Sequence, residues 1–201
     1  MKEMPIFEEV FARVVRQSGF WIKMLVGGLL SFVPVLNLFA FGYLYRLSNS
    51  AQRRGGVTLP DWSDWKGLFT DGLKFAVVWL AYWLVPMLLA FAVSSLLGWI
   101  GLGALAYLVV SLVFVLSPVI FGAALYRYNR RGEFQDLLDV ALIIRMSYHA
   151  FPRQIVPALF FFGVFALCPP LYGFSLFFGF TLLILQTVLS FRSVERRSIA
   201  L

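Results

Sequence analysis

The chain has 201 residues, a formal net charge of +7, and a composition that is 61% hydrophobic and only 13% charged. Soluble domains contain about 45–50% apolar and about 25% charged residues, so an ordinary soluble protein is excluded. A disordered chain is excluded as well, because disordered segments are poor in apolar and aromatic residues. The composition predicts an all-α, polytopic helical membrane bundle.

Charge divides the chain into alternating stretches. Charged residues fall in 1–23, 46–74, 127–153 and 192–201, and the blocks 24–45, 75–126 and 154–191 carry none. A helix needs about 20 apolar residues to cross a hydrocarbon layer about 30 Å thick. We therefore expect membrane-spanning helices in the charge-free blocks, within a single transmembrane domain over residues 1–201.

The first predicted element is an amphipathic helix over residues 6–18. Apolar residues recur at helical spacing from Phe7 to Val15, while Glu8 and Glu9 occupy the other face. This pattern is typical of an interfacial helix that lies in the headgroup plane and anchors a bundle.

Residues 20–46 are predicted to form a kinked or re-entrant segment, because Pro34 and Asn37 interrupt an apolar block. Two interpretations remain open. A re-entrant pair of half-helices keeps the N-terminus cytoplasmic, whereas one kinked span places it outside. The net positive N-terminal stretch and Lys23 favour the re-entrant pair.

The middle block predicts a helical hairpin over 75–97 and 102–126. Its turn contains three glycines and an interfacial tryptophan: Gly98, Trp99, Gly101 and Gly103. Glycine suits a tight reversal of the chain, and tryptophan is enriched at the headgroup level.

A second interfacial helix is predicted over 134–149, followed by a hairpin over 154–191 that is broken at Cys168–Pro170. Consecutive prolines lack two amide donors and disfavour helical geometry in the residue before each. Asp136 and Asp139, near the start of 134–149, are interpreted as capping residues rather than as a general acid–base pair.

Each charge-free block ends in an aromatic residue followed by a basic cluster, which begins at Arg46, Arg127 and Arg192 respectively. This pattern indicates an internal repeat. All four charged stretches are net positive, so the positive-inside rule predicts a multi-pass protein of the cell (inner) membrane with cytoplasmic linkers and C-terminus. The basic residues indicate contact with anionic lipids and not with nucleic acid.

Three stretches carry a resemblance to a known family. They are residues 27–46, with Gly-Gly-Leu-Leu-Ser-Phe-Val-Pro-Val-Leu-Asn and Gly-Tyr-Leu-Tyr-Arg; residues 59–74, with Leu-Pro-Asp-Trp-Ser-Asp-Trp; and the pattern around Tyr128, Gly132, Phe134 and Arg145. Together they resemble a prokaryotic integral membrane protein family catalogued only as a domain of unknown function, number four thousand and thirteen. The resemblance covers nearly the whole chain and implies no activity or functional residues.

Enzyme chemistry finds no support in the sequence. No charged residue lies within the apolar blocks, which argues against proton relays and carboxylate ion sites. His149 and Cys168 are single residues of their types and form no ligand cluster. We expect a protein that is not an enzyme, with no catalytic, cofactor-binding or metal site and no cofactor.

A candidate ligand or lipid site is formed by helix breaks and hydroxyls at membrane depth, namely Pro34, Asn37, Pro86, Ser111, Ser117 and Pro118. Backbone groups freed by proline must be buried in protein or line a cavity. The alternative interpretation is that the helices are merely kinked and the serines bond to their own helices.

Trp62 and Trp65 form a candidate partner surface in a charged linker, although two tryptophans can equally rest at the headgroup boundary. The first functional hypothesis is a scaffold or accessory subunit that packs against other membrane proteins or itself. The alternative is a small transporter or lipid-handling protein. Membrane lipids are expected partners in both cases.

Overall fold

The computed structural model describes residues 6–167 and 169–199, and within them every regular element is helical. In chain order the elements are α1 (Phe7–Val15), α2 (Phe20–Leu30), α3 (Asn37–Arg54), α4 (Trp65–Trp79), the π-helical turn η1 (Leu80–Leu84), α5 (Val85–Trp99), α6 (Gly103–Arg131), α7 (Gln135–Leu138), α8 (Val140–Leu167), the 3-10 turn η2 (Pro169–Leu171) and α9 (Tyr172–Ile199). The expected all-α fold is confirmed.

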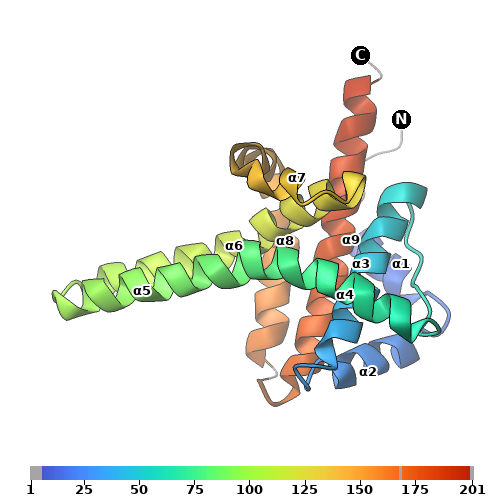
Figure 1. Ribbon diagram of the computed structural model, residues 1–201, viewed down its shortest axis with the longest axis horizontal. Helices are drawn as coiled ribbons and strands as arrows, with labels where there is room; N and C mark the ends of the chain where they lie inside the picture. The colour runs from blue at the N-terminus through green and yellow to red at the C-terminus, as the bar shows by residue number, and fades with distance from the viewer. Residues whose placement is uncertain (1–5, 168, 200–201) are drawn as a thin grey trace.

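Helix α9 lies at the centre of the fold, and α8, α2, α3, α6 and α1 all pack against it (Figure 1). Its Leu182, Leu183 and Leu185 are completely buried. In the most apolar 18-residue window of Pro169–Ser193, 83% of the residues are buried inside the protein. We refer to α2, α3, α8 and α9 together as the bundle.

Glycines allow the helices to approach closely where they meet. A Cβ atom on Gly42 of α3 would lie 1.8 Å from the carbonyl oxygen of Leu68 in α4. A Cβ atom on Gly72 of α4 would lie 1.8 Å from the carbonyl oxygen of Leu38 in α3. The two backbones therefore touch at a pair of positions where only glycine fits.

The C-terminal ends of α3, α6 and α9 meet at what we call the basic end. The Arg192 guanidinium of α9 donates hydrogen bonds to the carbonyl oxygens of Ala51 (3.2 Å) and Gln52 (2.7 Å) in α3. Arg130 of α6 forms an ion pair with Glu195 of α9, with 2.7 Å between nitrogen and oxygen. A cation is favourable there because the last carbonyl groups of a helix carry partial negative charge.

At the opposite end of the bundle, the turn 31–36 and η2 contain no charged residue, and we call this the uncharged end. The turn 31–36 between α2 and α3 meets η2 there. The Tyr172 hydroxyl donates to the carbonyl oxygen of Phe32 (3.1 Å), and the two rings pack edge to face with centroids 4.8 Å apart.

Helices α5 and α6 form a hairpin that extends away from the bundle, and we call its outer part, residues 85–112, the arm (Figure 1). The chain reverses through Gly101, whose φ of 81° lies in the left-handed region. Ala90 and Ala106 are the arm's only buried residues. Its exposed apolar side chains include Leu88, Leu89, Phe91, Val93, Leu96, Trp99, Ile100, Leu102, Leu105, Tyr107, Leu108 and Leu112.

The first helix of this hairpin is longer than the expected 75–97. α4, η1 and α5 run without interruption over Trp65–Trp99, 35 residues that span about 52 Å at 1.5 Å per residue. The π-helical turn ends at Leu84, two residues before Pro86, which has no amide hydrogen and whose ring would collide with the carbonyl group four residues earlier in a regular α-helix. The wider turn accommodates both constraints without ending the helix.

Other boundaries also differ from the expectations. Residues 20–46 fall into two helices separated by the turn 31–36. Helix α8 continues through Pro152 and Pro157, so the expected interfacial helix 134–149 and the first half of the hairpin 154–191 are mostly one helix. Of the expected break at Cys168–Pro170, Cys168 lies outside the described residues, and Pro169 begins η2.

Helix α1 packs its apolar face against the protein itself. The Phe7 ring lies 5.3 Å from that of Phe160 in α8, and the Phe11 ring lies 6.1 Å from that of Phe178 in α9. Val10 is completely buried as well. The apolar face of α1, from which an interfacial helix was predicted, therefore covers the aromatic surface of α8 and α9.

Candidate functional site

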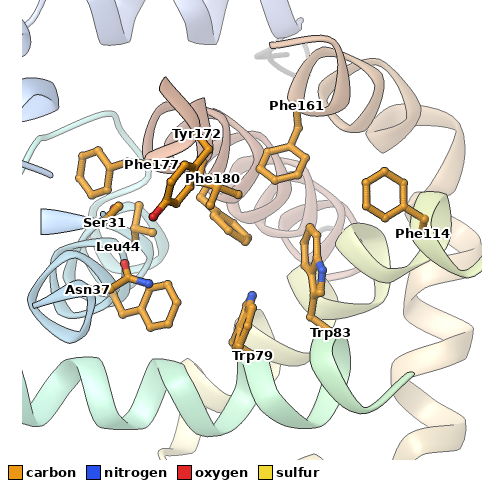
Figure 2. Close-up of a pocket in the computed structure, with 12 residues that line it drawn as sticks. Ser31, Asn37, Leu44, Trp79, Trp83, Phe114, Phe161, Tyr172, Phe177 and Phe180 are labelled. Carbon is orange, nitrogen blue, oxygen red and sulfur yellow. The ribbon is translucent and has the colours of Figure 1, made fainter. Parts of the chain in front are cut away.

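A cavity of about 230 Å³ lies where the arm joins the bundle, and it is partly open to the surface (Figure 2). Its walls come from α3, α4, η1, α6, α8 and α9, together with Ser31, the first residue of the turn between α2 and α3. The lining residues are Ser31, Asn37, Phe41, Leu44, Trp79, Trp83, Phe114, Phe161, Tyr172, Leu176, Phe177 and Phe180. None of them is charged, and eight are aromatic.

The π-helical turn forms one wall of this cavity. Trp79 immediately precedes it, and Trp83 lies within it, four residues further along the same face. π-helical turns are rare and are often found at functional sites. The Trp83 ring also packs against Phe161 and Phe180, with centroids 5.5 Å and 5.2 Å away, and this contact fixes the wall to α8 and α9.

Two of the polar groups at the cavity are already paired. The Ser31 hydroxyl donates to the carbonyl oxygen of Gly27 (2.8 Å), and the Tyr172 hydroxyl donates to Phe32 as described above. Within the described part of the chain, neither the side-chain amide of Asn37 nor the indole N–H of Trp79 makes a hydrogen bond. The cavity is thus apolar with unused hydrogen-bonding groups.

Asn37 is the one residue of the expected ligand or lipid site that lines the cavity. Pro34 is exposed in the turn 31–36, Pro86 lies in α5 beyond the π-helical turn, and Ser111 is exposed on α6. The structure does not bring these residues together.

The remaining two residues of that set lie inside α6. Ser117 and Pro118 are both buried, and the Ser117 hydroxyl donates to the carbonyl oxygen of Val113 in its own helix (2.7 Å). This is the arrangement that the alternative interpretation describes, in which serine bonds back to its own helix.

The tryptophans of the candidate partner surface lie in different environments. Trp62 stacks on Tyr43 with ring centroids 4.5 Å apart and also packs near Phe177. Trp65 is 45% exposed and contacts Phe39 edge to face. Most of the exposed surface of this candidate partner surface therefore comes from Trp65.

The loop that carries Trp62 is held to the fold by charged groups. The Lys23 ammonium pairs with Asp61 (2.7 Å), and the Arg46 guanidinium pairs with Asp64 (2.8 Å) and Asp71 (2.9 Å). Arg46, together with the backbone N–H of Gly67, holds the pKa of the Asp64 carboxyl below its usual value. This network orders the loop between α3 and α4.

Sequence reasoning missed most of the cavity wall, including Trp79, Trp83 and Leu176. A weak signal was present, because two tryptophans four residues apart lie near the start of the charge-free block 75–126. Among the described residues, no group of three or more His, Cys, Asp and Glu side chains is arranged to hold a metal ion.

In the part of the chain that the structure describes, the fold and the site define an all-helical protein with three helical stretches long and apolar enough to cross a membrane: Trp65–Trp99, Gly103–Arg131 and Pro169–Ser193. The chain belongs to the family described as Protein of unknown function (DUF4013), which matches residues 26–185 and confirms the resemblance seen in the sequence. No match was found among curated proteins or among solved structures.

Proposed function

We propose that this protein is a multi-pass protein of the cell (inner) membrane, with the charged linkers and the C-terminus on the cytoplasmic side. The basic and uncharged ends of the bundle support this orientation, because basic residues accumulate on the cytoplasmic side. Gln17, before α2, donates to the carbonyl oxygen of Val57, and Lys23 of α2 donates to that of Leu59. The loop that follows α3 therefore lies beside the start of α2, so the chain enters and leaves the α2–α3 pair on the same side. This arrangement supports a re-entrant α2–α3 pair.

Within that membrane, the protein acts as a scaffold or accessory subunit without catalytic machinery and packs against other membrane proteins. The observation that carries this proposal is the exposed apolar surface of the arm. Within the arm only Ala90 and Ala106 are buried inside the protein, and most of its other side chains are apolar. Contiguous apolar surface of this extent requires a covering of lipid or protein.

The test is site-specific photocrosslinking in native membranes. A photoreactive residue at Leu96 or Leu108 of the arm is expected to give a protein adduct of constant mass. The same residue at exposed Glu133, outside the arm, is the matched control and is expected to give none. Adducts with lipid alone at both arm positions would contradict the scaffold, and release of the protein from membranes at alkaline pH would contradict its insertion.

A small transporter or lipid-handling protein is the second candidate function. One observation favours it, namely the uncharged cavity between the arm and the bundle. The two functions are compatible in one molecule, because the arm surface and the cavity are formed by different side chains.

A further inference from the structure

We propose that this cavity binds one unbranched alkyl chain that carries an uncharged group able to accept hydrogen bonds. The inference deepens the second proposed function and rests on it. Its basis is the combination of cavity size, an uncharged aromatic wall, and unused hydrogen-bonding groups at Asn37 and Trp79.

The size of the cavity restricts the occupant. Its volume of about 230 Å³ exceeds that of a cavity of about 150 Å³ that takes up benzene or xenon. It is smaller than the pockets of about 300–1,000 Å³ that hold drug-sized ligands. A slender chain fits between these limits, and a fused-ring lipid does not.

The residues that line the cavity determine which kind of ligand it can hold. The aromatic side chains offer dispersion contacts, which an empty apolar space forfeits. Since no lining residue is charged, a charged headgroup inside the cavity would lose its solvation without compensation. The occupant therefore enters by its hydrocarbon part.

The hydrogen-bonding groups place the polar part of the occupant. Figure 2 shows Asn37 on one side of the open space and Phe114 on the other, with the indole nitrogen of Trp79 directed toward the middle. An indole N–H only donates, and an amide both donates and accepts. A hydroxyl, ester or amide oxygen between Asn37 and Trp79 satisfies both groups, while the chain extends toward Phe114.

The test uses protein purified in a sterol-based detergent, which has no straight alkyl chain to compete. We expect 1-dodecanol to raise the melting temperature by roughly 5–10 °C at a concentration of about 100 times its Kd. The shifts with n-dodecane and with dodecyltrimethylammonium should both be smaller, because neither molecule offers an uncharged acceptor to Asn37 and Trp79. No shift with 1-dodecanol, the result for a cavity filled with water, overturns the inference.

Two variants separate the cavity from general detergent effects. Leu176→Trp fills the space and is expected to abolish the shift, whereas Leu112→Trp, on the exposed arm, is expected to retain it. Asn37→Leu keeps the volume and is expected to make the shifts with 1-dodecanol and n-dodecane equal. An unchanged preference for 1-dodecanol in Asn37→Leu, or an unchanged shift in folded Leu176→Trp, overturns the inference.

A second experiment identifies the molecule to which the bound alkyl chain belongs. It uses nanodiscs that contain phosphatidylcholine with a photoreactive acyl chain. Labelling of Trp79 or Leu176 identifies a phospholipid acyl chain, and its absence together with a 1-dodecanol shift identifies a free single-chain ligand. Either result supports the shared chemistry. If alkaline pH releases the protein while the shift is retained, membrane insertion fails and the cavity inference stands.

Discussion

Gly42 illustrates how one missing methyl group determines a helix contact. A Cβ atom there would collide with the backbone of α4 at Leu68. Backbone atoms cannot move aside by a change of rotamer, as a side chain can. We expect Gly42→Ala to destabilise the protein by about 1–3 kcal/mol, the usual cost of overpacking. The measurement is thermal unfolding in detergent.

Gly98→Ala is the matched control for this substitution. Gly98 lies in helix α5, and no heavy atom lies within 4 Å of a Cβ built there. Alanine is favoured over glycine inside a helix by about 0.5–1 kcal/mol, so this variant should be neutral or slightly stabilised. Equal destabilisation of the two variants would contradict the close contact.

Gln154 is a buried side chain whose polarity has no use in the fold. It is completely buried in α8, and neither its amide nitrogen nor its oxygen has a hydrogen-bond partner among the described residues. A buried, unpaired polar group costs about 1–3 kcal/mol, so Gln154→Leu is expected to raise the melting temperature.

Gln52→Leu is the control that tests whether the rise in melting temperature expected for Gln154→Leu depends on the lack of hydrogen-bond partners at Gln154. The Gln52 amide donates to the carbonyl oxygen of Tyr126 (3.2 Å), and that bond joins α3 to α6. Its loss is expected to lower the melting temperature. A fall in both variants would show that Gln154 has a stabilising role.

At the scale of elements, the arm gives the sharpest prediction, since it contains no charged residue and its exposed side chains are mostly apolar. Leu89 lies ten residues before Trp99, or about 15 Å along the helix, near the middle of a layer about 30 Å thick. Lysine at that depth costs about 2.5–3.5 kcal/mol on insertion scales. Leu89→Lys should therefore reduce insertion of the α5–α6 hairpin.

Labelling of a cysteine introduced at Ile100 with an impermeant reagent measures that insertion, after Cys168 is replaced by serine. Leu102→Lys, in the turn itself, is the control and should leave labelling unchanged, because lysine there reaches water. Unchanged labelling in Leu89→Lys would mean that the hairpin does not cross the layer.

The elements also show what the sequence could and could not predict. The hairpin was predictable because an uncharged block is long enough for two helices and contains a glycine turn. The start of its first helix at Trp65 was not, because Lys66, Asp71 and Lys74 are compatible with helix but not with an apolar block. The cavity was mostly hidden because its walls come from separate elements that meet only in the folded protein.

At the scale of the whole molecule, the basic end joins three distant segments. Arg192 links α9 to α3 through two carbonyl groups, and hydrogen bonds that involve a charged group contribute about 1.5–3 kcal/mol. Arg192→Gln is expected to lose stability of this order in thermal unfolding. Arg131→Gln, at an exposed position, is the control. Equal stability of the two variants would show that the basic end needs no such link.

The central position of α9 has a consequence for biosynthesis. Ribosomes make a chain from its N-terminus, so the helices that surround α9 emerge before the one against which they pack. During that interval the small residues that later touch α9, such as Gly27 opposite Phe177, have no partner within the chain. The helices α1, α2, α3, α6 and α8 can therefore reach their final packing only after α9 has been synthesised.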